Sequence, residues 1–272
     1  MKPIENLTYT DDGMFQAVMH EQKICKEIVE RLLHIQVGHI DYPDLEKTIA
    51  PYYTSKGIRM DVYLKDSDRV IDVEMQARSR SALGKRTRYY QSMIDIDSLL
   101  KGQDYSELKE SYILFICKED PFDKDENEKF GLPCYTFKTM CAENPNVNLN
   151  DKTTKVVYNS SAWEKEKDQW LRNYLHYIFT NETGEDDFSR ELSTAVEKKK
   201  QDEKFRSLYL SMNLHDRDIR MEAMKEAKEQ KALEATINLL KMKLGTPEQI
   251  AQAEGLPLEK VLELQKGILV EE

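Results

Sequence analysis

The sequence predicts an α/β fold over residues 1–160, in which a small mixed sheet is flanked by helices, and a helical region over residues 161–272. The first observation is that short apolar or alternating segments, the pattern of β-strands, recur among helical periodicities in the first part. The second is that residues 146–244 contain no proline and one glycine, Gly184, and are rich in helix-forming residues. We therefore expect two domains that meet near residue 160.

The composition is that of a folded protein. Hydrophobic residues make up 40% and charged residues 33% of the 272 positions, which excludes a disordered or collagen-like chain. The strongest apolar run, at 112–117, is too short to cross a bilayer, and the N-terminal residues lack the apolar stretch of a secretory signal. We expect a cytoplasmic protein without a membrane partner. The cysteines and histidines have no zinc-like spacing, so we expect free, mostly buried thiols.

The first elements expected are helices and a hairpin. Apolar residues at near-helical spacing predict one or two helices over 14–38, ending at Gly38, with Phe15 buried. The segments 58–66 and 69–77 alternate in residue type across a short polar link, which predicts an antiparallel hairpin. Residues 81–101 read as a helix that ends before Gly102.

Three more strands complete the expected sheet. The continuous apolar run at 111–118 suits a central strand, and the segments PCYTFKT and KVVYN predict two weaker ones. The helical region beyond them includes residues 163–181 and 186–244. We expect that these C-terminal helices could mediate homo-oligomerisation, because the mixed charges of 220–245 are typical of an exposed or self-associating helix.

Residues 246–267 predict two short helices. Thr246 with Gln249 fits a capping box, Pro247 fits the first helical position and Gly255 fits a C-terminal stop. A helix-turn-helix that reads DNA is one interpretation. The second helix has few base-reading side chains and as many acids as bases, which favours the alternative of packing within the protein.

Two carboxylates of the expected hairpin could meet on one face of the sheet. Strand side chains alternate, so Asp72, Glu74 and Gln76 share one face of the second strand, and Asp61 lies on the first. If the register opposes them, Asp61 and Glu74 would converge on one ion. Carboxylate oxygens suit Mg²⁺, which polarises phosphorus and activates water for in-line attack. Alternating carboxylates also occur on any exposed sheet face, and this second interpretation remains open.

Charge is unevenly distributed along the chain. The formal net charge of -10 argues against a protein that coats nucleic acid, so any contact with DNA must be local. Residues 76–91 carry five basic and no acidic side chains. Within this patch, Arg86 and Tyr90 lie four residues apart on one helical face, whereas Arg88 lies on another. A solvated helix face is the alternative interpretation.

A family resemblance joins these features. The segments LTYTDDGMFQAVM, KGIRMDVYL, IDVEMQ, RTRYYQSMIDIDSLLKGQDYSELK and SYILFIC, in this order and spacing, resemble the PD-(D/E)XK nuclease family transposases, also called Rpn-type recombination-promoting nucleases. The resemblance covers most of residues 6–137. It implies a restriction-endonuclease-like fold, Mg²⁺-dependent DNA cleavage, with Mn²⁺ as a substitute, and a role in recombination or transposition.

The resemblance also assigns residues. Asp61 falls on the strand aspartate, Glu74 on the glutamate of the E-x-K element, and Gln76 on the position of the lysine, which is replaced here. The early helix of the family implies a further carboxylate ligand, for which Glu21 is the candidate. Glutamine hydrogen-bonds but carries no charge, so another cation could be needed.

The local candidates for that positive charge are Arg78, Lys56 and Arg59. We predict that Asp61, Glu74 and Gln76 form the catalytic centre. The residues expected to contact DNA are Arg78, Arg86, Arg88 and Tyr90. The alternative function is a non-catalytic DNA-binding or protein-interaction module that retains the nuclease fold, which the loss of the lysine and the acidic balance of the chain favour.

Overall fold

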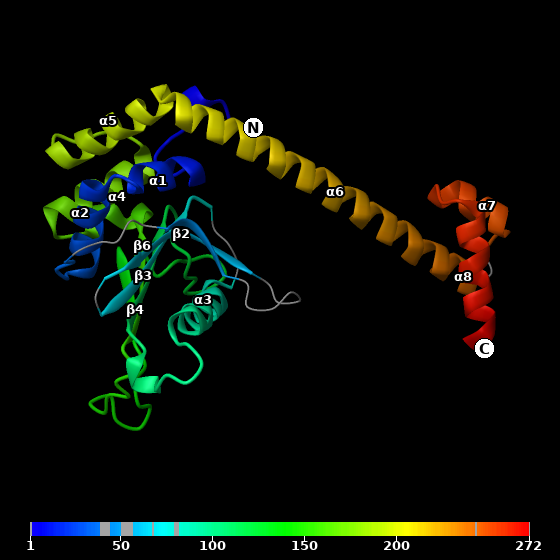
Figure 1. Ribbon diagram of the computed structural model, residues 1–272, viewed down its shortest axis with the longest axis horizontal. Coiled ribbons are helices and arrows are strands. Elements are labelled where there is room, and N and C mark those ends of the chain that lie inside the picture. Colours follow the sequence, from blue (N-terminus) through cyan, green and yellow to red (C-terminus); the bar gives the residue numbers. More distant parts are fainter. Residues whose placement is uncertain are drawn as a thin grey trace. The chain divides into compact units, whose positions relative to one another are not determined.

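The computed structural model describes residues 2–38, 44–49, 57–66, 68–78, 82–242 and 244–271 (Figure 1). The chain divides into two units, Met1–Arg206 and Ser207–Glu272, which are considered separately below. Among the described residues, no helix is both long enough and apolar enough to span a membrane.

A mixed sheet of six strands forms the centre of the first unit. Its strands are β1 (Asp44–Ile49), β2 (Ile58–Lys65), β3 (Arg69–Gln76), β4 (Glu110–Cys117), β5 (Cys134–Phe137) and β6 (Thr153–Asn159), in the spatial order β1-β2-β3-β4-β6-β5. The central strands β3, β4 and β6 are parallel, and the other neighbours are antiparallel. The predicted hairpin and central strand are confirmed. The sequence analysis missed the edge strand β1.

Helices surround this sheet. Those of the first unit are α1 (Asp12–Met19), α2 (Gln22–Leu33), α3 (Leu83–Ser98), α4 (Gln169–Thr180), α5 (Asp187–Gln201) and the start of α6 (Glu203–Lys241), with 3-10 turns η1 (Ile4–Asn6), η2 (Tyr105–Glu107) and η3 (Ser160–Lys165). Figure 1 shows α3 apart from the group formed by α1, α2, α4 and α5. The predicted mixed sheet with flanking helices is therefore confirmed.

The alternation of side chains along the strands explains how both faces are covered. Ile113, Phe115 and Val157 belong to one buried cluster with Tyr90 and Met93 of α3. Tyr158 follows Val157 and so points to the opposite face. There its hydroxyl donates to the backbone oxygen of Leu32 in α2, at 2.6 Å. The polar side chains of β3 that matter below lie on the face covered by α3.

An aromatic cluster ties the N-terminal segment to the later helices. The Tyr9 ring lies 5.4 Å from that of Phe15 and 6.3 Å from that of Tyr174, and Tyr174 lies 6.2 Å from Phe188 of α5. Phe15 is fully buried, as predicted. Because these contacts cross residue 160, α4 and α5 belong to the same unit as the sheet. The division into domains at residue 160 stays a prediction.

The predicted helical segment 14–38 ends earlier than expected. It forms two helices, and α2 stops at Leu33 because His34 adopts the left-handed conformation, with φ 53° and ψ 41°. The prediction of an end at Gly38 was wrong. A left-handed residue after the last helical turn is the usual C-terminal cap, and glycine is common there but not required.

The second unit contains the rest of α6, α7 (Pro247–Glu254) and α8 (Leu258–Glu271). The predicted capping box is present, since the side chains of Thr246 and Gln249 each accept from the other's backbone N–H, and Gly255 is left-handed with φ 69°. Ile250 and Val261 are buried against Leu239, Leu240 and Leu256. This packing supports the structural interpretation of these helices, and DNA reading by them stays untested.

Candidate active site

Strands β2 and β3 separate where their two carboxylates meet. Their backbone pairing runs from Lys65↔Val70 to Val62↔Val73. One residue further, the Asp61 N–H donates to Glu74 Oε1 at 3.1 Å, and the Met75 N–H donates to Asp61 Oδ2 at 3.0 Å. Each carboxylate therefore accepts a backbone N–H from the opposite strand. The structure brings Asp61 and Glu74 together, as the sequence analysis required.

Helix α1 covers the Asp61 side of this pair. Gln16 donates from Nε2 to Asp61 Oδ1 at 3.4 Å. The Asp12 carboxylate is also close enough to raise the pKa of Asp61 through its charge and a hydrogen bond. Asp12 in turn accepts from Arg59 Nη2 at 3.0 Å. Helix α1 thus brings one amide and one carboxylate to the hairpin.

A third carboxylate lies on the same strand face. Asp72 is two residues before Glu74 and pairs with Tyr63 across the hairpin. Its side chain is fully buried, and neither oxygen has a hydrogen-bond partner among the described residues. A buried polar group without a partner is costly and unusual in a folded protein. The period-two alternation of β3 placed Asp72 on the correct face, but the sequence analysis gave it no role.

Burial and mutual repulsion disfavour the ionised forms of these carboxylates. Burial is the main cause that raises the pKa of Asp61 to about 7, and the Asp12 charge adds to it. Burial likewise raises the pKa of Asp72 and of Glu74 well above their ordinary values, with further contributions from the neighbouring carboxylates. A positive charge that enters this cluster would stabilise the ionised carboxylates, because opposite charges within a few ångströms favour ionisation.

One cation of the chain already reaches this cluster. Arg86 of α3 donates from Nη1 to Gln76 Oε1 at 2.8 Å, and its Nη2 lies 3.7 Å from Glu74 Oε2. The same guanidinium donates to the Tyr90 hydroxyl at 3.3 Å. It also lies over the Phe115 ring, 5.3 Å from its centre. Arg86 therefore belongs to the interior of the site rather than to an open surface.

The other residues predicted to contact DNA lie in different environments. Arg78 follows β3 and is exposed, and Arg88 is exposed on α3. Tyr90 is buried, with 8% of its surface exposed, and its ring lies against Phe115. Only the two exposed arginines present a charged group directly to solvent.

Three residues were candidates for the cation that replaces the family's lysine. Arg59 lies beside Asp12, Arg78 lies beyond the strand, and Lys56 is outside the described residues.

The structure connects Glu21 with a different element. Its carboxylate lies 3.3 Å from Lys199 Nζ of α5. The neighbours of Asp61 from the N-terminal region are instead Asp12 and Gln16, both in α1. The sequence alone does not show which residues of the N-terminal helices face Asp61, because that depends on how α1 packs on β2. The role of Glu21 as a ligand stays a prediction.

The carboxylate pair fits a hard divalent cation. Within the described part of the chain, no three His, Cys, Asp or Glu side chains are arranged together to hold a metal ion. The pair of Asp61 and Glu74 supplies oxygen ligands, however, and the oxygens of Asp72 have no hydrogen-bond partner among the described residues. A cation with two protein carboxylates, completed by water and phosphate oxygens, is the usual binding mode of Mg²⁺.

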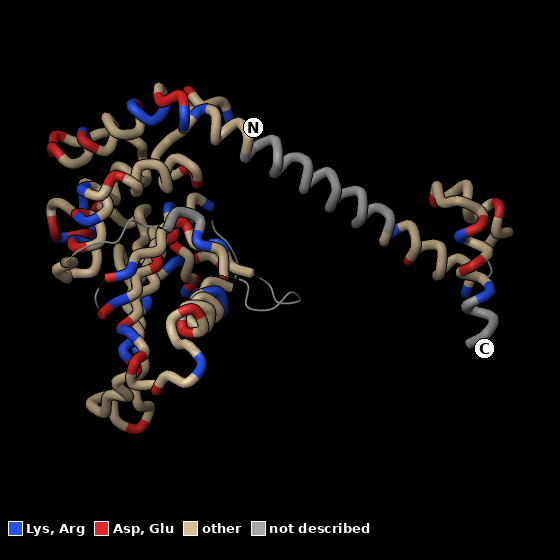
Figure 2. The backbone as a smooth tube through the Cα atoms, in the orientation of Figure 1, with Lys and Arg blue, Asp and Glu red and all other residues tan. Residues whose placement is uncertain are grey.

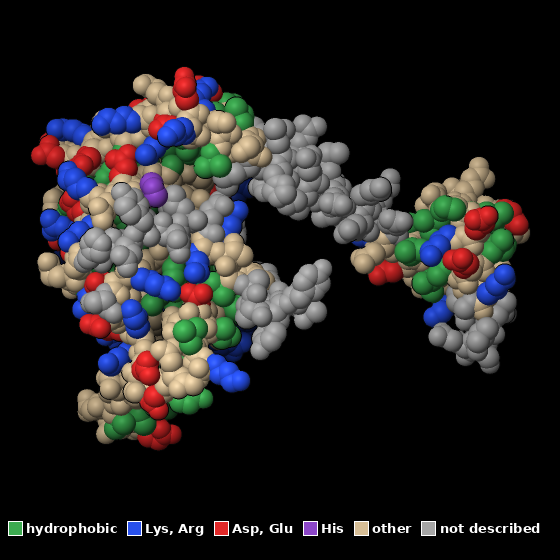
Figure 3. Space-filling view, viewed as in Figure 1, with side chains coloured by type: hydrophobic (Ala, Val, Ile, Leu, Met, Phe, Trp, Pro, Cys, Tyr) green, Lys and Arg blue, Asp and Glu red, His purple; other side chains and the backbone are tan. Residues whose placement is uncertain are grey.

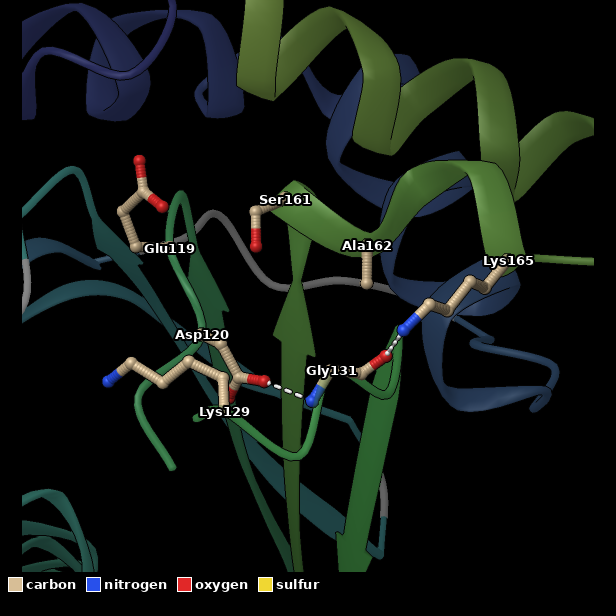
Figure 4. A pocket seen from close by; sticks show the side chains of 7 residues that line it. All are labelled: Glu119, Asp120, Lys129, Gly131, Ser161, Ala162 and Lys165. Atoms are coloured by element: carbon tan, nitrogen blue, oxygen red, sulfur yellow. Dashed lines mark hydrogen bonds between the residues drawn. The ribbon is translucent and has the colours of Figure 1, made fainter. Parts of the chain in front are cut away.

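A separate cavity of about 350 Å³ lies at the carboxyl ends of β4 and β6. Figure 4 shows its lining, with Asp120 directed at Gly131 and Lys165 reaching over the same glycine. Asp120 accepts from the Gly131 N–H and from the Tyr135 hydroxyl, both at 2.7 Å, and Lys165 Nζ donates to the Gly131 oxygen at 2.8 Å. These contacts fold the segment between β4 and β5. The sequence analysis did not predict this cavity.

Charges of both signs are interspersed over the first unit. Figure 2 shows basic and acidic residues alternating along its helices and strands, and the face seen in Figure 3 carries both kinds of side chain. A broad basic surface is therefore not visible on that face. Local basic groups beside the carboxylates remain the means by which an acidic chain could contact DNA.

Comparison with known proteins identifies the family of this region. The family model for the PD-(D/E)XK nuclease family transposase matches residues 14–134, which include β2, β3, α3 and β4. Neither the curated proteins nor the solved structures contain a significant match. The match confirms the predicted family and agrees with a restriction-endonuclease-like arrangement of the sheet and helices.

Proposed function

The family model for the PD-(D/E)XK nuclease family transposase matches residues 14–134, and we propose that the protein is a metal-dependent DNA endonuclease associated with recombination or transposition. It hydrolyses phosphodiester bonds with Mg²⁺, for which Mn²⁺ can substitute. The family by itself indicates a nuclease-related or transposition-related function. Our proposal adds to this the metal ion, DNA as the substrate, and the residues that act on the DNA.

The interlocked carboxylates of Asp61 and Glu74 carry this proposal. Each uses one oxygen to accept a backbone N–H from the other strand. This leaves Asp61 Oδ1 and Glu74 Oε2 directed at side-chain partners, the Gln16 amide and the Arg86 guanidinium. Preformed oxygen donors held by backbone contacts need little reorganisation when a cation and substrate enter.

In this proposal Asp61 and Glu74 hold the divalent cation. When bound, such an ion polarises the phosphoryl group and activates water for hydrolysis. Gln76 lies two residues after Glu74 on the same strand face and donates hydrogen bonds to substrate oxygens. Asp72 does not reach the substrate, because it is fully buried. A cation bound by its neighbours would favour ionisation of Asp72, and this coupling would strengthen cation binding.

The DNA backbone is held by exposed basic side chains next to this centre. Arg78 follows β3 directly, and Arg88 lies on the exposed side of α3. Each can neutralise one phosphate. Their number is small, which agrees with a formal net charge of -10 and predicts weak DNA binding with a shallow dependence on salt concentration.

We also propose a cytoplasmic location and self-association through the C-terminal helices. Exposed leucine and methionine side chains near both ends of α6, among them Leu208, Leu210 and Met242, support self-association. Light scattering of the purified chain over a concentration series tests it, and a constant monomer mass would contradict it.

A plasmid-nicking assay tests the proposed activity. Supercoiled DNA is incubated with the purified protein in Mg²⁺, in Mn²⁺ and in EDTA, and with the variants Asp61→Ala and Glu74→Gln. We expect nicking by the wild type only when metal is present, and a loss of activity in both variants. Glu126→Gln, which changes an exposed carboxylate of the same unit, is the matched control. Metal-independent nicking, or full activity of Asp61→Ala, would refute this centre. DNA binding without cleavage would instead favour the non-catalytic module.

A further inference from the structure

The side-chain amide of Gln76 has a defined orientation. Arg86 Nη1 donates to Gln76 Oε1 at 2.8 Å, and Gln76 Nε2 donates to the backbone oxygen of Met75 at 3.1 Å. A guanidinium carries donors only, so the atom facing it must be the amide oxygen. The acceptor of Gln76 is therefore occupied. Of the two N–H bonds of its amino group, one is directed at Met75, and the other has no partner among the described residues and can donate to an incoming oxygen.

Arg86 is itself held from several sides. Its guanidinium lies over the rings of Tyr90 and Phe115, donates to the Tyr90 hydroxyl and lies near Glu74. Only 21% of its side chain is exposed. Several contacts of a planar, always charged group restrict its rotamers far more than a single ion pair would. Arg86 can therefore orient a neighbouring side chain reliably.

We propose that Arg86 is a positioning residue, which occupies the oxygen of Gln76 and so turns this glutamine into a group that only donates hydrogen bonds toward the substrate. The inference rests on the proposed function, since it assigns Gln76 a substrate oxygen as its second acceptor. An unconstrained glutamine presents its oxygen as readily as its amino group, and an oxygen facing a phosphate would repel it. Arg86 removes that possibility.

This role differs from that of a phosphate contact. A phosphate-binding arginine faces solvent and leaves its donors to the DNA, whereas Arg86 uses its donors on Gln76 and Tyr90. Arg88, two residues later, is exposed on the same helix. The pair thus offers a matched comparison, in which Arg86→Ala disturbs the orientation of Gln76 and Arg88→Ala removes a phosphate contact.

The first measurement does not require activity. The protein is labelled with ¹⁵N in glutamine side chains, and the Gln76 amide signals are assigned by their disappearance in Gln76→Glu. We expect them to shift and their hydrogen exchange to accelerate in Arg86→Ala, and to stay unchanged in Arg88→Ala. Arg86→Lys, which keeps a charged donor, should restore the signals in part and guards against loss of folding. Unchanged Gln76 signals in Arg86→Ala would overturn the inference.

The second measurement uses DNA. Arg86→Ala should lower the cleavage rate about 10- to 100-fold, as loss of an orienting group does at other metal-assisted sites. Its affinity for DNA across a salt series, measured in Ca²⁺, should keep the wild-type slope. Arg88→Ala should reduce the slope by about one unit. A reduced slope in Arg86→Ala would show a phosphate contact and refute the positioning role. If the wild type cleaves no DNA, the proposed function fails, and the amide signals decide the orientation of Gln76 separately.

Discussion

Replacing Asp61 with asparagine should stabilise the protein in the absence of metal, although it removes a proposed ligand. Asparagine keeps an oxygen for the Met75 N–H, which Asp61 Oδ2 now accepts. Its amino group can donate to Asp12, the carboxylate whose charge opposes ionisation of Asp61. The substitution therefore keeps the Met75 hydrogen bond, exchanges the long contact from Gln16 for one to Asp12, and removes one charge from a buried, acidic cluster.

The magnitude follows from the pKa of Asp61. Burial and the Asp12 charge raise this pKa from 3.8 to about 7. The pKa of Asp61 is higher in the folded state than in the unfolded state. Below pH 3.8 the carboxyl is protonated in both states, so the raised pKa costs no stability there. As pH rises from 3.8 toward 7, the free energy of unfolding of the wild type falls. A tenfold change in the acid dissociation constant corresponds to about 1.4 kcal/mol. The variant should therefore gain on the order of 4 kcal/mol at pH 8, and almost nothing at pH 4.

Chemical denaturation in EDTA at pH 4, 6 and 8 measures this difference. Adding Mg²⁺ at pH 8 should stabilise the wild type and have little effect on the variant, because the ion binds the folded state through Asp61. Glu126→Gln, at an exposed position, should show neither effect. Equal stability of wild type and Asp61→Asn at pH 8 in EDTA would refute the reasoning, as would an advantage of the variant that does not change with pH.

Three further predictions concern binding and packing. The double variant Arg78→Ala, Arg88→Ala should reduce the salt dependence of DNA affinity by about two units in a filter-binding series, and an unchanged slope would place the DNA elsewhere. Phe15→Ala should lower the free energy of unfolding by about 3–5 kcal/mol in urea, because the ring is fully buried, and a loss below about 1 kcal/mol would contradict its place in the core. Thr246→Ala should cost about 1 kcal/mol of local stability through loss of the capping box, seen as faster hydrogen exchange in α7, while exchange in the sheet stays the same.

Local patterns were sufficient for most elements of the fold. The alternation of 58–66 and 69–77 predicted the hairpin because strand side chains alternate whatever surrounds them. The capping box at Thr246 was recognised for a similar reason, since it involves neighbours along the chain. The end of α2 was misplaced because His34, a residue without glycine's conformational freedom, adopts the left-handed cap.

In the candidate site, too, some features follow from local sequence and others depend on tertiary packing. Pattern and family resemblance placed Asp61, Glu74 and Gln76 on one site, because two strands in a hairpin have few possible registers. The positions of Asp12 and Gln16 depend on how α1 packs on β2, which no local pattern specifies. The unpartnered state of Asp72 likewise depends on everything that packs around it.

The sequence by itself predicted the hairpin, the central strand, the pair of carboxylates and the resemblance to a nuclease family, because each depends on residue spacing along the chain. Only the tertiary structure decided what surrounds them. Arg86 is ten residues from Gln76 and in the sequence belongs to a basic patch, yet α3 folds back over the sheet and places its guanidinium 2.8 Å from the Gln76 oxygen. The physical reason is that burial, and with it the cost of unpaired charge, is a property of the whole packed structure rather than of any segment.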